Sequence, residues 1–151
     1  MMADQTHFYI LKQGTQQWNQ WRLAYPHIRP DLSKADLAKA DLRFTNFSQT
    51  NLSYVNLTDA RLDGANFSGA DLSLAILHTA TLTAANLSYA NLTAADLTGA
   101  DLRQARLNFA NLRVAKLNGT DLRDADLTSA NLDGATLDNA KRRKGLWNMF
   151  D

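Results

Sequence analysis

Residues 95–104 read ADLTGADLRQ, which is one five-residue unit written twice. Leu or Phe recurs at every fifth position from Leu32 to Leu137 without a break, in 22 units. Two positions earlier the chain carries Ala in 17 of these units, and the residue between them is Asp or Asn in 16. An internal repeat this regular decides the fold class before any other feature is considered. The units without Ala carry Pro30, Thr45, Thr50, Val55 and Thr120.

A period of five residues does not suit a helix. At about 100° per residue, each Leu would be turned roughly 140° from the last. In extended backbone, residues two apart point to the same side, so the Ala and Leu of each unit face inward and the Asp or Asn faces outward. The two remaining residues are rich in Ser, Thr, Gly, Asn and Asp, which favour turns. The pattern therefore predicts an all-β solenoid with a leucine core and coils about 4.8 Å apart.

The five-residue period leaves the number of sides per coil open. Phe47 and Phe67 are 20 residues apart, which favours four units per coil. Ser53 and Ser68 are 15 apart, and similar pairs would fit three units equally well.

The Ala, Asp or Asn, Leu unit followed by two variable residues resembles the pentapeptide repeat family over residues 30–140. This resemblance implies a right-handed quadrilateral β-helix with four units per coil. The leader from Leu11 to Leu32 is similar to the segment before the repeats in many cyanobacterial members. The best understood members protect DNA gyrase from quinolones by imitating duplex DNA. The resemblance therefore implies a DNA-mimicking, topoisomerase-binding protein as one alternative function.

The charge distribution disfavours that alternative. Residues 31–140 carry a net charge of −4, whereas residues 1–30 carry +2 and residues 141–151 carry +3. Duplex DNA carries one negative charge about every 1.7 Å, so −4 is weak for an imitation. We therefore do not expect nucleic acid as a partner. The bases that stand in place of the usual Asp or Asn are Arg61, Arg106 and Lys116.

Residues 1–29 are expected to cap one end of the coil, because an open end exposes core leucines and unpaired strand edges. Residues 15–24 favour a short helix with Thr15 as its N-cap. An aromatic cage around a ligand is the alternative role for the tryptophans in this helix. The residues predicted to form the lid are Trp18, Trp21 and Leu11.

Residues 141–151 combine four adjacent bases with an apolar tail. We expect this segment to be a C-terminal lid or a self-association element, which would allow a homodimer through a coil end. A docking peptide for another protein is a second interpretation, and contact with anionic lipid or nucleic acid is a third. Its candidate interface residues are Leu146, Trp147 and Phe150.

Several outward positions carry apolar residues that the core does not require. If the coil has four sides, Tyr54, Leu74 and Val114 share one column, beside Ile76. A second column then contains Tyr89 and Phe109. Exposed apolar columns on a rigid coil are candidate protein interfaces. The alternative is that they only support neighbouring coils.

Nothing in the sequence resembles a catalytic or metal-binding constellation. The absence of cysteine excludes disulfides, thiolate metal sites and a cysteine nucleophile. The three histidines, His7, His27 and His78, lack the close spacing of a metal site. We see no signal peptide and no membrane-spanning run, and we expect a cytoplasmic protein. The sequence predicts a non-enzymatic scaffold without cofactors, which binds an unidentified protein partner.

Overall fold

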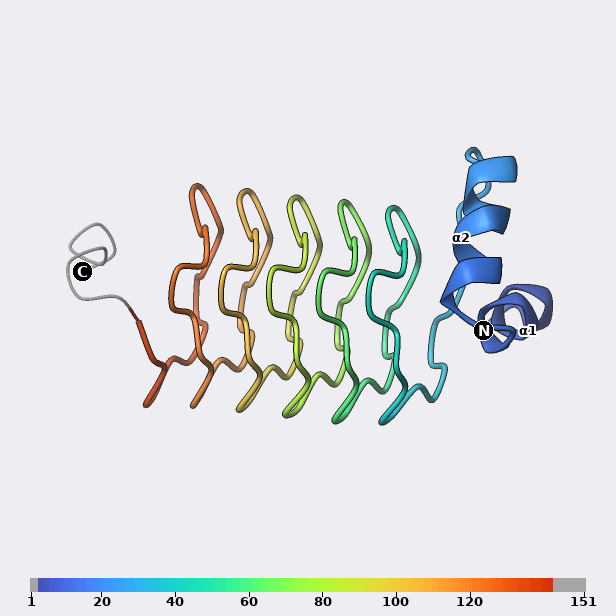
Figure 1. The fold of residues 1–151 in the computed structure, drawn as a ribbon. Helices are drawn as coiled ribbons and strands as arrows, with labels where there is room; N and C mark the ends of the chain where they lie inside the picture. The colour runs from blue at the N-terminus through green and yellow to red at the C-terminus, as the bar shows by residue number, and fades with distance from the viewer. Residues whose placement is uncertain (1–2, 143–151) are drawn as a thin grey trace.

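The computed structural model describes residues 3–142. Figure 1 shows a rod of stacked coils with two helices at its N-terminal end. Helix α1 spans Gln5–Lys12 and helix α2 spans Thr15–Ala24. Among the described residues, no helix is long and apolar enough to cross a membrane.

Each coil has four sides. Every side pairs with the next coil through a single parallel bridge, and the bridged residues are always 20 apart, from Asp31 with Asn51 to Asp121 with Lys141. Twenty residues contain four five-residue units, so the four-sided coil is confirmed and the three-sided alternative is wrong. The sides are short because a corner follows every bridge.

The backbone hydrogen bonds explain why five residues suffice for a side and a corner. The amide of Ala90 donates to the carbonyl of Leu87 at 3.1 Å, which closes the corner. The amide of Leu87 donates to the carbonyl of Arg106 in the next coil at 2.7 Å. The second corner residue has a positive φ in every unit, between 50° and 71°. The turn composition predicted the corners but not this left-handed conformation, which residues other than Gly, Asn and Asp seldom adopt.

The core is the predicted set of inward columns. Leu87 and Ala85 are fully buried, as are their equivalents in the middle coils, and Phe47 stacks on Phe67 with ring centroids 5.2 Å apart. Burial of each Leu contributes roughly 1.5–3 kcal/mol. At the C-terminal end the inward side chains are only partly buried. These are Leu127, Leu132 and Leu137.

The N-terminal cap differs from its prediction in two respects. Helix α1, which begins after Asp4 as the N-cap, was not predicted at all. The N-cap of α2 is Gly14, with φ 110°, so the prediction of Thr15 as N-cap is wrong. Thr15 is the first helical residue, and its hydroxyl instead pairs with the Thr45 hydroxyl at 2.9 Å. A partner in the first coil thus outweighs the local capping preference.

Helix α2 takes the place of a missing coil along one side of the first coil. The indole Nε1 of Trp18 donates to the carbonyl of Asn46 at 2.8 Å, and the Asn19 side chain accepts from the Asn46 amide at 2.8 Å. Arg22 donates to the carbonyl of Ser48 at 2.7 Å. Trp18 and Asn19 each lie on the same side of the helix as Arg22, which follows them by four and three residues. The edge that would otherwise be open is therefore paired by side chains.

The aromatic part of the cap is packed and not hollow. Trp18 is fully buried, lies 5.9 Å from Phe47 between ring centroids and contacts Trp21 at 5.3 Å. Leu11 is also buried, and Trp21 is partly buried against the core. The indole of Trp18 thus packs against the first coil, and the ligand-cage alternative does not fit a fully buried indole.

Candidate interaction surface

The first column of apolar residues lies along one edge of the coil. Tyr54, Leu74 and Val114 occupy the second corner position at intervals of 20 residues and 40 residues, with Ala94 between Leu74 and Val114. Their exposed fractions are 53%, 45% and 53%. Lys34 begins the same column, with its ammonium 5.8 Å from the centre of the Tyr54 ring. We call this column the valine edge.

The second column lies along a neighbouring edge. Tyr89 and Phe109 stack almost in parallel, with ring centroids 4.9 Å apart and an interplanar angle of 7°. Both rings remain at least half exposed, at 62% and 50%. We call this column the aromatic edge.

The two edges border the same side of the coil. Tyr89 precedes Ala94 by one unit, and Phe109 precedes Val114 by one unit. Because one unit forms one side, the edges are separated in each coil by one outward residue and the corner residue that follows it two positions later. This side is called the asparagine face, and its outward residues are Asp31, Asn51, Asp71, Asn91, Asn111 and Asn131.

The asparagine face is held together by side-chain hydrogen bonds between coils. The side-chain amide of Asn91 donates to the carboxylate of Asp71 at 3.1 Å, and the side-chain amide of Asn51 donates to the carboxylate of Asp31 at 3.2 Å. Each outward oxygen also accepts from the backbone amide two residues later, as in Asn91 with Thr93 at 3.2 Å. Beyond Asp71 the outward residues at the bridges of this face carry no charge, whereas the corner residues that follow Asn111 and Asn131 are the exposed Arg113 and Asp133. The part of the face around Asn91 is therefore polar, uncharged and made of short side chains, and the part around Asn111 includes the Arg113 cation.

Ile76 lies on the adjacent face, two residues after Leu74, and is 44% exposed. It bridges to Asn56 and Asp96 in the neighbouring coils. It therefore widens the valine edge but does not lie between the two edges.

Val114 has a strained backbone. Its φ is 50°, and a β-branched residue with positive φ is a genuine outlier. Its Cγ1 would lie 3.0 Å from a Cβ added to Gly134, so Val114 leans along the edge toward the next coil.

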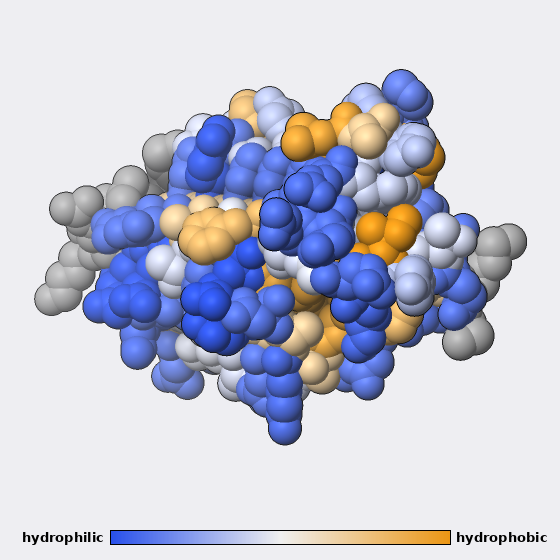
Figure 2. Space-filling view, turned by 45° about the vertical axis from the view of Figure 1, so that its right-hand side comes forward, coloured by the Kyte–Doolittle hydropathy of each residue, from blue (hydrophilic) through white to orange (hydrophobic). Residues whose placement is uncertain are grey.

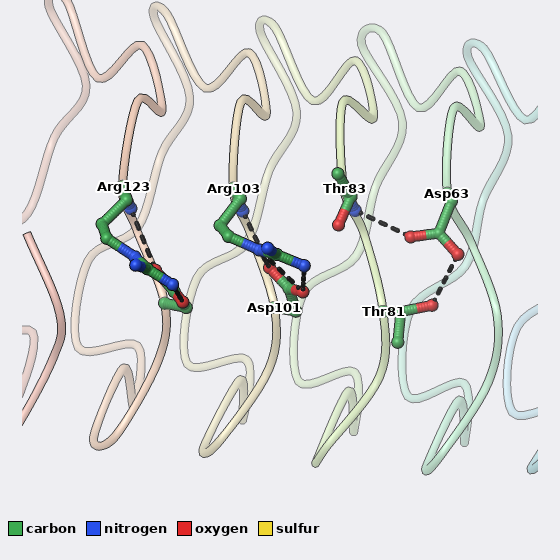
Figure 3. Close-up of polar contacts among 7 residues, drawn as sticks. Asp63, Thr81, Thr83, Asp101, Arg103 and Arg123 are labelled. Carbon is green, nitrogen blue, oxygen red and sulfur yellow. Dashed lines mark hydrogen bonds and ion pairs between the residues drawn. The ribbon is translucent and has the colours of Figure 1, made fainter.

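The face opposite the asparagine face is charged, and its charges are paired. Arg103 donates two close hydrogen bonds to Asp101 at 2.9 and 2.7 Å, and Arg123 binds Asp121 in the same way at 2.9 and 2.6 Å (Figure 3). Hydrogen bonds from these arginines hold the pKa values of the Asp101 and Asp121 carboxyls below the usual range.

Asp63 on this face is instead bound by threonines. It accepts from the Thr81 hydroxyl at 2.8 Å and from the Thr83 amide at 3.1 Å, as Figure 3 shows. A shallow pocket of about 250 Å³ lies beside these residues, lined by Thr83, Arg103, Gln104, Arg123 and Asp124. Because the guanidinium groups are neutralised by their own carboxylates, the pocket lacks the excess positive charge that an anion site needs.

The same pairing bears on the DNA-mimicking alternative. Arg43 and Arg61 both approach Asp41, at 2.7 and 3.3 Å, and Lys116 lies 3.8 Å from Asp96. The carboxylates of the coil are thus interspersed with cations along its length, unlike the continuous negative charge of a duplex.

Two of the histidines, His78 and His7, make structural contacts. The ring of His78 bonds to the carbonyl of Thr98 in the next coil at 2.8 Å, so the ring is exposed and also bonded. His7 accepts from the Asp31 amide at 3.2 Å and contacts Trp21. Within residues 3–142, no group of three or more His, Cys, Asp or Glu side chains could hold a metal ion.

Sequence reasoning missed other exposed apolar residues. Phe44 is 70% exposed and occupies the same corner position as Tyr54, where its ring lies over Gly64. Its place in the repeat would have identified it. Leu23, on the outer side of α2, is 80% exposed. Figure 2 shows such hydrophobic side chains as separate patches on a largely polar surface. The tail candidates Leu146, Trp147 and Phe150 lie outside the described residues.

Comparisons with known proteins identify the repeat. The family model for pentapeptide repeats, in eight copies, matches residues 31–69, 40–78, 75–113 and 105–141. The chain is 30% identical to the pentapeptide repeat protein Rfr23 from the cyanobacterium Cyanothece 51142, covering 83% of this chain and 97% of that one, with a TM-score of 0.46.

Two further solved structures are more distant in shape. HetL from the cyanobacterium Nostoc sp. strain PCC 7120, which is involved in the regulation of heterocyst differentiation, is 34% identical. That match covers 78% of this chain and 65% of HetL, with a TM-score of 0.37. QnrB1, a plasmid-mediated fluoroquinolone resistance protein, is 19% identical over 76% of this chain and 68% of its own, with a TM-score of 0.32. The search of curated proteins found no match.

Proposed function

Because this chain belongs to the pentapeptide repeat family, we propose that it is a non-catalytic scaffold that binds a partner protein through the asparagine face and its two apolar edges. The observation that carries the proposal is the placement of exposed apolar side chains on both borders of one face, whose outward bridge residues beyond Asp71 are uncharged asparagines. The cores of protein interfaces are depleted in charge and enriched in aromatic residues. The central part of the asparagine face carries the aromatic Tyr89 and Phe109 beside the uncharged Asn91 and Asn111, and Arg113 is its one cation, of a residue type that interfaces also enrich.

The backbone conformation of the corners adds a second argument. An L-residue in the left-handed region costs roughly 1–2 kcal/mol, and Gly, Asn and Asp are the residues that visit this region routinely. Val114 and Leu74 occupy it at φ 50° and 58° while leaving about half of each side chain in water. The burial that they gain within the coil is therefore partial. Contact with a partner would use the apolar surface that remains exposed.

The structural alternative applies most strongly to the aromatic edge. Tyr89 and Phe109 stack on each other, and an aromatic pair of this geometry contributes roughly 0.5–1.5 kcal/mol beyond its buried area. Tyr54 is the one aromatic residue among Tyr54, Leu74 and Val114. Ala94 lies between Leu74 and Val114 along the edge. The valine edge is therefore the better position to test for binding.

The test compares two triple variants in partner capture from native lysate, with quantitative mass spectrometry. The first variant carries Tyr54→Ser, Leu74→Ser and Val114→Ser. The matched control carries Phe44→Ser, Ala84→Ser and Gln104→Ser, which change the same corner position on another edge. We expect a protein that is enriched by the natural chain and by the control to be lost from the first variant, with both variants still folded by circular dichroism. If the first variant captures the same proteins as the natural chain, the valine edge is not the interface.

Two further expectations accompany the proposal. The paired charges lead us to expect no effect of the protein on DNA supercoiling by gyrase in vitro, and inhibition or protection of gyrase would favour the DNA-mimicking alternative instead. The cytoplasmic location expected from the sequence stays a prediction.

A further inference from the structure

The sequence contains a single Asn-Gly pair, Asn118 and Gly119, and the structure places both residues at one corner of the coil. Asn followed by Gly is prone to deamidation, because Gly has no side chain to hinder attack by its own backbone nitrogen on the preceding side-chain amide. Gly119 is exposed, and a Cβ built on it would meet no atom within 4 Å. Neighbouring side chains therefore do not obstruct the reaction at this corner.

Deamidation requires two groups of the pair to meet. The backbone nitrogen of Gly119 loses its proton to a base in the solvent and attacks Cγ of Asn118. The new C–N bond closes a succinimide ring, while the bond from Cγ to Nδ2 breaks and Nδ2 leaves as ammonia with a proton taken from water. A second water molecule then opens the ring at one of its two carbonyls, which gives aspartate or isoaspartate. Water is thus the only co-reactant.

In the folded chain, one residue of the next coil holds both reacting groups. The backbone amide of Gly119 donates to the carbonyl of Asp138 at 2.8 Å, and the backbone amide of Asp138 donates to Oδ1 of Asn118 at 3.0 Å. The first hydrogen bond retains the proton that has to leave. The second directs the Asn118 side chain toward the next coil, away from the nitrogen that would attack it.

The hydrogen bond to Asn118 results from a departure from the repeat. In many units the amide of the first corner residue donates to the Asp or Asn two residues earlier, as the amide of Thr98 does to Asp96 at 3.0 Å. Two residues before Asp138 the chain carries Thr136 instead. The Asp138 amide therefore takes its acceptor from the preceding coil, and that acceptor is Asn118.

The same replacement has the same result on another face. Thr81 stands where most units have Asp or Asn, and the amide of Thr83 donates to Asp63 in the preceding coil at 3.1 Å (Figure 3). A missing acceptor within the unit is thus replaced in both places by the first corner residue of the coil before it. At Asn118 that corner residue belongs to the Asn-Gly pair.

We propose that Asn118 is a deamidation site, which is closed while the backbone of Asp138 holds Asn118 and Gly119 and reacts when this contact opens. Isoaspartate adds one carbon to the backbone at a corner. The residues after it then no longer keep the 20-residue register that bridges Asp101 to Asp121. Each opening of the corner thus exposes the coil to a chemical change that closing does not reverse. The site lies outside the asparagine face, so this inference is independent of the proposed interaction surface.

The test measures deamidation of the full-length protein at each asparagine by peptide mapping with mass spectrometry, in mildly alkaline buffer. Isoaspartyl methyltransferase provides a second detection of isoaspartate. In urea we expect Asn118 to react faster than the other asparagines, and in the folded chain we expect its reaction to be at least about tenfold slower than in urea. If Asn118 reacts no faster than the others in urea, or equally fast in the folded and unfolded chain, the proposal is overturned.

Variants at two positions test the contact itself. Asp138→Pro removes the N–H that binds Asn118, and Thr136→Asn gives the Asp138 amide the usual acceptor within its own unit. We expect either change to speed deamidation of the folded chain about fivefold, which is the effect of losing one hydrogen bond of typical strength. Asp138→Ala keeps both backbone groups and is the matched control, with the rate of the natural chain expected.

Two outcomes with these variants would contradict the gating by Asp138. One is the natural rate in both Asp138→Pro and Thr136→Asn, with circular dichroism showing that they are folded. The other is an equal acceleration in Asp138→Ala and Asp138→Pro, which would make the lost carboxylate the cause. Because Thr136→Asn restores the residue type that the repeat uses elsewhere, it tests the contact even if Asp138→Pro does not fold.

Discussion

The indole Nε1 of Trp18 donates a hydrogen bond to the backbone carbonyl of Asn46 at 2.8 Å, while the indole ring covers Phe47. One side chain therefore performs the two tasks of an additional coil, which are to pair the backbone edge and to bury the core. Asn19 completes the pairing by accepting from the amide of the same Asn46. Helix α2 pairs this side of the first coil with side chains, whereas the described coils pair with one another through backbone hydrogen bonds.

The cap leads to a prediction about stability. Trp18→Ala is expected to lower the free energy of unfolding by about 3–5 kcal/mol, because it empties a fully buried site over Phe47. Trp18→Phe keeps a ring at this site but loses the hydrogen bond to Asn46, and is expected to cost less. Urea unfolding followed by circular dichroism measures both. Tyr9→Ala, at a side chain that is 67% exposed, is the control and should stay within about 0.5 kcal/mol of the natural chain. If Trp18→Ala lowers the free energy of unfolding by as little as Tyr9→Ala does, the contact of α2 with Phe47 does not stabilise the coil.

The corner conformation leads to a second prediction, at two glycines. Gly119→Ala places a Cβ in open space at φ 68°, so it is expected to cost only the left-handed penalty of roughly 1–2 kcal/mol. Gly134→Ala has a similar φ of 69° but brings the new Cβ to 3.0 Å from the Val114 Cγ1, and is expected to cost more.

A double variant separates the two contributions at this corner. In a chain that already carries Val114→Gly, this contact is absent. The cost of Gly134→Ala, measured relative to that chain, should then equal the cost of Gly119→Ala measured relative to the natural chain. The free energies come from urea unfolding at equilibrium. Equal costs of the two single substitutions would mean that the Val114 side chain does not lean over Gly134.

The arginine and aspartate pairs lead to a third prediction, on acid stability. The pKa of the Asp101 carboxyl is lowered in the folded protein, chiefly by its hydrogen bonds to Arg103. A carboxyl with a lowered folded pKa contributes stability above its unfolded pKa of about 3.9, and this contribution is lost as the pH falls through the folded pKa. Arg103→Gln is therefore expected to lower stability near pH 6 but to make it fall less steeply on acidification to pH 2.

The matched control for this prediction is Arg113→Gln, because Arg113 follows the uncharged Asn111 where Arg103 follows Asp101. Its stability should show the same pH slope as that of the natural chain. The pair of Arg103 with Asp101 lies on the surface, so the difference in pH slope between Arg103→Gln and the natural chain is expected to shrink at high salt. If Arg103→Gln and Arg113→Gln have the same pH slope, the pair with Asp101 does not contribute to folding.

The inward and outward positions could be predicted because they depend on neighbours in sequence. Ala85 and Leu87 are two residues apart in extended backbone, and both are fully buried as predicted. The column that pairs Tyr89 with Phe109 was predicted only if four sides were assumed. The four sides themselves depend on corner angles, and these follow from left-handed backbone that Tyr89 and Phe109 do not favour by themselves.

The cap was only half predictable, for a different reason. Trp18 and Leu11 were predicted as members of the lid, and both are buried. Nothing in the sequence assigned a role to Asn19 or Arg22. Their partners, the Asn46 amide and the Ser48 carbonyl, lie 27 and 26 residues away in sequence. No local pattern marks a hydrogen bond over that distance.

The sequence by itself determined that this protein is a coil of five-residue units with leucine inside, because period and burial are properties of neighbouring residues. Only the tertiary structure decided that Tyr89 with Phe109 and Leu74 with Val114 border the same face, and that the bridge residues of this face beyond Asp71 are the asparagines Asn91, Asn111 and Asn131. The physical reason is that stacking brings together residues 20 apart. The number of corners that closes a coil is set by backbone geometry and by hydrogen bonds between coils, which the order of side chains does not specify.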